Sequence, residues 1–335
     1  MKKSDNDKTG NAAAHQWEKS IEEEMMEFQD ELRGASGVGR RKGGGQKKRE
    51  PILSPEVRDL IGQANMHYVL EEYDEAITKI EEVIRLEPKA RAAWHLFSSI
   101  KTDKGEHSES LKLRIIAAHL PPYEASTWKE LAIESRHFNA PQQAIYCYSQ
   151  VLRLDRLDFD SIWDRAFLYK QVGMFKNAAN GFKTLLKSFP HDPSVLKELC
   201  PLLLHLGEYR DAKKVLSQGW DYYRETFPLP TPEQTKEMMN VEHFRWLVNI
   251  HIYLRNWDEV IQLSKECTRW LQGRLNETFW DLLEDDREYD MERNLRSTEN
   301  RIEVGLGVNT IDPELRLALG QARLEKGHKD EANVS

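Results

Sequence analysis

The residues of this chain with the most obvious chemical potential are three cysteines and eleven histidines. Cys147, Cys200 and Cys267 form no CxxC pair and have no metal-ligand spacing, and the histidines are scattered along the chain. The sequence contains no HExxH motif, no Walker loop and no nucleophile elbow. We therefore expect no catalytic residue, no metal and no cofactor, and we expect the protein not to be an enzyme.

A run of cations near the N-terminus is the second group that could do chemistry. Six of the ten residues from 40 to 49 are basic and none is acidic. Such a run suits a nuclear import signal, a weak DNA contact or a solvated linker, and nuclear import is the favoured interpretation. The cations are Arg40, Arg41, Lys42, Lys47, Lys48 and Arg49.

Composition limits the elements that could position these groups. The 335 residues include 48 basic and 56 acidic side chains, so the net charge is −8, and 39% of the residues are apolar. This apolar fraction predicts a packed core with much wetted surface, either in two domains or in one long array. Net acidity argues against a surface built mainly to grip phosphate. The absence of an apolar run of about 18 residues predicts no membrane contact, and the sparse cysteines predict a reducing compartment.

A repeat of 34 residues runs through the middle of the chain, with helix-type apolar spacing on both sides of each turn. Small side chains recur at this interval, as is needed where two antiparallel helices cross closely. The second-helix column is Ala76, Ser110, Ala144, Ala178 and Ala212. The first-helix column is Ala64, Ser98, Ala132, Ala166 and Cys200.

This pattern resembles the tetratricopeptide repeat. The resemblance implies an all-α fold, a right-handed superhelix or solenoid. The Gly, Ser and clustered charge of residues 34–49 predict that a disordered N-terminal tail precedes it. The expected organisation is a tail at 1–50 with a possible helix at 15–33, five tandem repeats at 51–226, a proline linker and sixth repeat at 227–271, an acidic insertion at 272–312, and the first helix of a truncated seventh repeat at 313–335.

The tetratricopeptide resemblance also implies a groove for a partner, lined by the first helix of each repeat. Cations beside aromatic rings there would suit a peptide or helix with acidic and apolar side chains. The alternative is that Trp163 and Phe167 only pack against the interior of the array. The predicted groove residues are Arg58, Asn65, His95, Lys129, Arg136, His137, Trp163, Phe167, Lys170, Lys197 and His205.

Several longer strings are more specific. FQDELRGASGVGRRKG (28–43), EEVIRLEPKARAAW (81–94) and IWDRAFLYKQVG (162–173) resemble the tetratricopeptide subunit of RNA polymerase III transcription factor IIIC, in its fungal tau-type form. The family's protein is much longer, so this chain is expected to be an N-terminal part of such a subunit.

The resemblance implies a nuclear scaffold rather than a catalyst. It implies that the chain assembles with other transcription factor IIIC subunits, that it docks the Brf-like and Bdp-like components of initiation factor IIIB at transfer RNA genes, and that it meets DNA mainly through the complex. Two alternatives remain at this stage: a scaffold of another nuclear RNA-processing complex, and direct DNA binding through residues 40–49.

Overall fold

The computed structural model describes residues 53–230, 234–271, 273, 275 and 312–328. The possible helix at 15–33, the basic run at 40–49 and nearly all of the acidic insertion lie outside these residues. Contacts divide the chain into two compact units, Met1–Asn177 and Ala178–Ser335, and each is described by itself.

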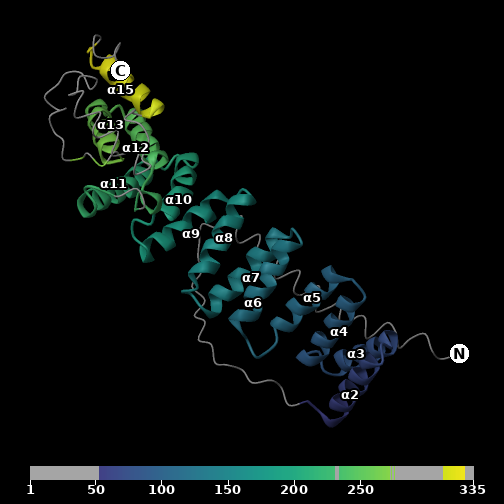
Figure 1. Ribbon diagram of the computed structural model, residues 1–335. Helices are drawn as coiled ribbons and strands as arrows, with labels where there is room; N and C mark the ends of the chain where they lie inside the picture. Colours follow the sequence, from purple (N-terminus) through teal and green to yellow (C-terminus); the bar gives the residue numbers. More distant parts are fainter. Residues whose placement is uncertain (1–52, 231–233, 272, 274, 276–311, 329–335) are drawn as a thin grey trace, which may run out of the picture. The chain divides into compact units, whose positions relative to one another are not determined.

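The first unit is a series of helical hairpins (Figure 1). α2 pairs with α3, α4 with α5 and α6 with α7, and each hairpin also contacts the next one along the chain. The helices are α2 (Pro55–Val69), α3 (Tyr73–Leu86), α4 (Arg91–Asp103), α5 (His107–Ala118), α6 (Ala125–His137), α7 (Pro141–Leu154) and α8 (Phe159–Gln171).

The second unit continues the same construction. α9 (Phe175–Ser188) begins in the first unit and runs into the second, α10 contacts α11, and α12 contacts α13 and α15. The remaining elements are α10 (Pro193–His205), α11 (Tyr209–Thr226), the short 3-10 helix η1 (Gln234–Glu237), α12 (Val241–Tyr253), α13 (Trp257–Leu271) and α15 (Pro313–Glu325).

Helices and turns account for the regular structure of the described residues, which contain no strand. The small-residue columns lie at the helix crossings, where Ala64, Ala76, Ala132 and Ala144 are fully buried. The prediction of an all-α tetratricopeptide fold is confirmed.

Large aromatic side chains fill the core between neighbouring hairpins. Trp94 is fully buried in α4, and its indole N–H donates to the carbonyl of Pro88 at 2.9 Å, in the loop that ends the preceding hairpin. In the second unit, Trp220, Phe244 and Trp270 form a cluster with ring centroids 5.1–5.8 Å apart. The Trp270 indole donates to the Phe227 carbonyl at 2.7 Å. Trp94 and Trp270 therefore each tie a helix to a loop as well as filling the core.

The turn after each first helix repeats one hydrogen-bonding pattern. Glu71, just after α2, has a φ of 60°, its N–H donates to the Tyr68 carbonyl, and the N–H of Glu72 donates to the His67 carbonyl. These bonds define a Schellman motif, which satisfies two carbonyls at the helix end. The equivalent residues, all with positive φ, are Glu71, Gly105, Asn139, Gly173, Gly207, Arg255 and Gly327.

Candidate partner-binding surface

The predicted groove residues of the first unit lie on α2, α4, α6 and α8, the first helices of its repeats. On α2, Arg58 and Asn65 are both exposed, and the Asn65 amide donates to the Ile61 carbonyl at 3.0 Å. The Tyr68 hydroxyl donates to the Asp103 carboxylate at 2.7 Å, which connects α2 to the end of α4. A side chain on one first helix thus meets a side chain of the next first helix.

On α4, His95 is half-buried and accepts a hydrogen bond from the Nε–H of Arg91 at 3.0 Å. The same guanidinium donates to the Pro122 carbonyl at 2.6 Å, in the loop that precedes α6. Arg91 therefore bridges two repeats and orients His95. The sequence pattern gave no sign that Arg91 has this role, because it looks there like any other cation of the chain.

On α6, both predicted groove cations have carboxylate partners in the following repeat. The ammonium of Lys129 lies 3.1 Å from Asp158 and 3.2 Å from Asp160. Partial burial opposes the charge of Lys129, but its hydrogen bonds to the two aspartates leave its pKa raised. Arg136 lies 3.2 Å from Asp164. These positive charges are therefore compensated within the unit before any partner arrives.

Asp164 also accepts a hydrogen bond from the Tyr148 hydroxyl at 2.7 Å. Its carboxylate is thus shared between α6 and α7, which form one hairpin, while it belongs itself to α8. Burial, together with the hydrogen bond to Asp164, raises the pKa of Tyr148 to about 12. The phenol therefore stays protonated and continues to donate at neutral pH.

The aromatic part of the predicted surface lies on α8. Trp163 and Lys170 are half-buried, and 37% of Phe167 is exposed. His137, at the end of α6, is exposed. A partly exposed ring between neighbouring helices suits an apolar anchor of a partner, so the groove stays a prediction with Phe167 as its most accessible aromatic residue.

In the second unit, Lys197 of α10 lies 3.4 Å from Glu242 at the start of α12, and His205 is exposed. The same repeat position on α12 is Arg245, whose guanidinium donates to both oxygens of Asp312 at 2.9 and 2.6 Å. Each of these cations is the fifth residue of its helix: Lys129 in α6, Lys197 in α10 and Arg245 in α12. A cation at this position pairs each time with an acid at the start of the next first helix.

Arg245 was missed by the sequence reasoning. A cation at the fifth helical residue was a usable signal, but the sequence separation of 67 between Arg245 and Asp312 conceals the pair.

All three cysteines are free and buried. Burial raises the pKa of Cys147 and of Cys200 to about 12, and it raises that of Cys267 well above its ordinary value. All three side chains are part of the buried core of the helical array. A thiol held in this protonated state is a poor nucleophile.

Two further findings concern the described part of the chain. No three of its histidine, cysteine, aspartate or glutamate side chains gather where they could hold a metal ion. None of its helices combines the length and the apolarity that a bilayer span requires.

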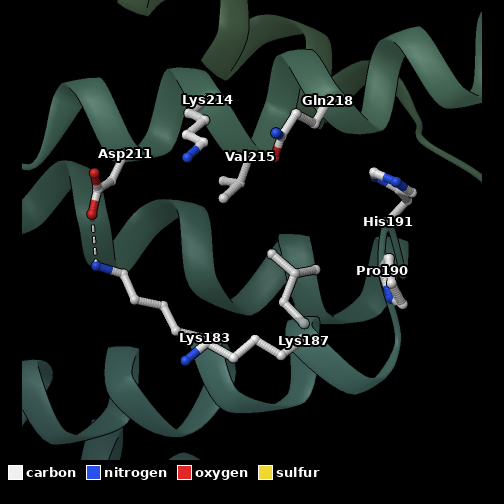
Figure 2. Close-up of a pocket in the computed structure, with 9 residues that line it drawn as sticks. Lys183, Lys187, Pro190, His191, Asp211, Lys214, Val215 and Gln218 are labelled. Carbon is white, nitrogen blue, oxygen red and sulfur yellow. Dashed lines mark hydrogen bonds and ion pairs between the residues drawn. The ribbon is translucent and has the colours of Figure 1, made fainter.

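A pocket of about 370 Å³ lies between α9 and α11, the second helices of consecutive repeats (Figure 2). The sequence reasoning missed it, because it considered only the first helices as binding elements. Its lining is rich in lysine, including Lys183, Lys187 and Lys214.

No family model matches the chain. Transcription factor tau subunit sfc4 of Schizosaccharomyces pombe is 29% identical over 324 residues, which cover 92% of this chain and 32% of the relative. The transcription factor tau 131 kDa subunit of Saccharomyces cerevisiae is 28% identical over 339 residues, covering 86% and 33%. General transcription factor 3C polypeptide 3 of Homo sapiens is 33% identical over 141 residues, covering 42% and 16%.

Solved structures with similar helical arrays include Naa15/Naa10 bound to HypK, at 16% identity and a TM-score of 0.43, with 83% of this chain and 35% of that chain covered. The tetratricopeptide protein YrrB is 15% identical at a TM-score of 0.30, with 48% and 84% covered.

The chain spans about a third of the length of the two fungal relatives. Its similarity to them extends over most of its own residues and includes the repeats. The relatives of this chain are subunits of transcription factor tau and of general transcription factor 3C, which confirms the resemblance to transcription factor IIIC predicted from the sequence.

Proposed function

We propose that this chain is a non-catalytic scaffold of transcription factor IIIC that docks initiation factor IIIB during RNA polymerase III transcription. In this role it assembles with other subunits of the factor in the nucleus and contacts the Brf-like and Bdp-like components of initiation factor IIIB. DNA is met mainly through the complex. The observation that carries the proposal is the 29% identity to a transcription factor tau subunit over 92% of the chain.

The chemistry of the described residues supports a binding role. The three thiols are buried and protonated, and Tyr68, Lys129 and Arg136 on the first helices form bridges to neighbouring repeats. Such bridges fix the spacing of the first helices, so a partner would meet a preorganised surface. Exposed Phe167 and His137 supply groups on that surface that could make new contacts.

A direct experiment tests docking. Tagged chain 1–335 is mixed with purified Brf-like and Bdp-like components at micromolar concentration, and the retained protein is quantified. We expect retention of at least one component, and Phe167→Ala should weaken it several-fold without loss of helical signal. No retention of either component would refute docking by this chain. Cross-linking to subunits of a different nuclear complex instead would favour the alternative scaffold.

A test of Arg136 needs a charge-swapped double variant, because Arg136→Glu alone would break the contact with Asp164. The double variant Arg136→Glu with Asp164→Arg restores an opposite-charge pair while inverting the charge offered at both positions. If Arg136 contacts an acidic partner, the double variant binds as poorly as the single one. If the double variant binds like the wild type, Arg136 acts only between the repeats.

A further inference from the structure

The pocket between α9 and α11 lies wholly within the second unit and on a different set of helices from the predicted groove. Figure 2 shows Lys183 and Lys187 on α9, with Lys214 and Gln218 reaching from α11 into the space between the two helices. Their spacing of four residues on each helix places each pair on one helical face.

The lysines of this pocket are unequally compensated. The Lys183 ammonium is paired with Asp211 at 2.8 Å and with Glu208 at 2.9 Å. Lys187 and Lys214 form no ion pair or hydrogen bond with any residue in the described ranges. The Asp211 carboxylate also lines the pocket and interacts electrostatically with Lys214, but its hydrogen bond and ion pair are with Lys183. A ligand carboxylate could therefore form a direct ion pair with Lys187 or with Lys214.

The end of the pocket is held in a fixed conformation by His191. This residue has a φ of 66°, a left-handed backbone conformation that residues other than glycine rarely adopt. Its ring stacks on Tyr222 with centroids 4.8 Å apart and planes 14° apart, and its carbonyl accepts a hydrogen bond from Tyr223 at 3.0 Å. Two contacts from α11 thus maintain a locally costly conformation, so the imidazole keeps its place in the pocket lining.

The rest of the lining is aliphatic. Leu186 and Val215 are half-buried between the lysines, and Pro190 adjoins His191. This combination suits a ligand that offers a branched apolar side chain next to acidic groups.

We propose that this pocket binds an acidic peptide segment of a partner protein, with a leucine-like side chain on Leu186 and Val215 and flanking carboxylates on Lys187 and Lys214. The site goes beyond the proposed docking function, since it needs no particular component of initiation factor IIIB. The occupant is expected to be acidic because the charges of Lys187 and Lys214 are positive. The half-buried Leu186 and Val215 favour a ligand with an apolar side chain next to its negative charges, so an acidic peptide is a better match than a phosphate backbone.

The test uses the whole chain 1–335 and a fluorescein-labelled twelve-residue peptide with a Leu-Leu pair between two groups of three glutamates. Fluorescence anisotropy is measured at 50 and 200 mM salt. We expect saturable binding in the micromolar range that weakens with salt. A peptide with glutamine in place of every glutamate should bind at least ten-fold more weakly.

Two double variants carry equal changes of charge. Lys187→Gln with Lys214→Gln should weaken peptide binding at least ten-fold. The matched control, Lys112→Gln with Lys176→Gln, changes two exposed lysines on α5 and at the start of α9, outside the pocket lining, and should leave binding within two-fold. Circular dichroism verifies that both variants keep their helices. Val215→Thr, which has nearly the same shape and no charge, should weaken binding as well, and this separates the apolar contact from the charges.

Four results would overturn the proposal. These are no saturable binding by the wild type, equal weakening by both double variants, displacement of the peptide by an equimolar twelve-nucleotide single-stranded DNA, and tighter peptide binding when the acids at 281–292 are changed to amides. The third would assign the lysines to nucleic acid. The fourth would make the chain's own acidic run the occupant. The initiation factor IIIB pull-down is read separately, so either proposal can fail while the other stands.

Discussion

At the scale of single residues, the turn after each first helix offers a direct test of backbone strain. Glu71 has a φ of 60° and lies at the turn position that is glycine in several other repeats. A residue with a Cβ pays about 1 kcal/mol for this conformation. We expect Glu71→Gly to stabilise the first unit by about 0.5–1 kcal/mol, because glycine adopts it freely but is less restricted when unfolded. Denaturant unfolding measures the change.

The same turn geometry predicts the effect of the opposite substitution, glycine to alanine, and of a control at Glu71. Gly173→Ala should destabilise by about 1 kcal/mol, because space for a Cβ is present there and only the φ of 79° is unfavourable. Glu71→Ala keeps the Cβ and should gain nothing. Equal stabilisation by Glu71→Ala and Glu71→Gly would attribute the effect to the lost carboxylate instead.

His119 predicts a dependence of stability on pH. Burial, assisted by the positive charge of Arg153, lowers its pKa from 6.5 to about 4, and its ring contacts Tyr146 and Trp128. The unfolded chain therefore binds a proton between pH 6.5 and 4 that the folded chain does not. Stability from this group is complete above pH 6.5 and declines as the pH falls towards 4, by about 3 kcal/mol in total.

Unfolding of the wild type and of His119→Gln at a series of pH values measures this contribution. The difference in unfolding free energy between them should be largest near pH 7.5 and shrink by about 3 kcal/mol on acidification to pH 4. Other groups titrate equally in both proteins and cancel. A difference that is constant with pH would show that His119 titrates normally.

At the scale of helices, the small-residue columns are the most informative positions. Ala144 is fully buried where α6 and α7 cross. Ala144→Glu inserts a charge and a longer side chain into this contact, so we expect a loss of at least about 3 kcal/mol. Gln142→Glu, on the exposed face of the same helix, should change stability by less than about 0.5 kcal/mol. Thermal melts that leave the two variants alike would mean that the assigned helix crossing is incorrect.

The connection between α12 and α15 depends on Arg245. Its two hydrogen bonds to Asp312 meet the residue that also caps α15, where the Asp312 carboxylate accepts the N–H groups of Glu314 and Leu315. We expect Arg245→Ala to speed amide hydrogen exchange in α15, because the helix loses a lateral contact while its cap remains. Lys197→Ala, which removes a longer and more exposed ion pair, should leave exchange in α12 nearly unchanged. Equal protection of α15 in both variants would contradict this role.

The helices show what the sequence could and could not predict. Apolar periodicity and small side chains at fixed spacing identify hairpins, because both follow from local helix geometry and close crossing. Lateral pairs such as Arg136 with Asp164 depend on where two side chains from different repeats point, and spacing along the chain does not contain that information. Cations that looked available for a partner therefore proved to be used between repeats.

At the scale of the molecule, unlike charges occupy different parts of the sequence. Residues 40–49 carry six cations, while seven acids and one base lie between 281 and 292. We expect the basic run to act in nuclear import. Replacing its six cations with glutamine should remove nuclear accumulation of a fluorescent fusion in yeast cells while the helical content of purified protein stays the same. Unchanged accumulation would assign import to another segment or to a partner.

The same glutamine variant distinguishes import from DNA contact. If the run binds DNA, the wild type should show a steep fall of affinity for duplex DNA with salt, and the variant should lose it. A shallow slope in both proteins would leave import as the function of the run.

The three buried thiols also report how often each part of the chain opens locally. The thiolate is the nucleophile that attacks an alkylating reagent, so a protonated and enclosed cysteine is modified only when its surroundings open. Cys147 belongs to the first unit, and Cys200 and Cys267 belong to the second. The rate of alkylation of each cysteine, followed by mass spectrometry of the native protein, would therefore measure local opening in each unit separately, with no engineered probe. The same measurement with a bound partner would show whether the partner slows opening in one unit or in both.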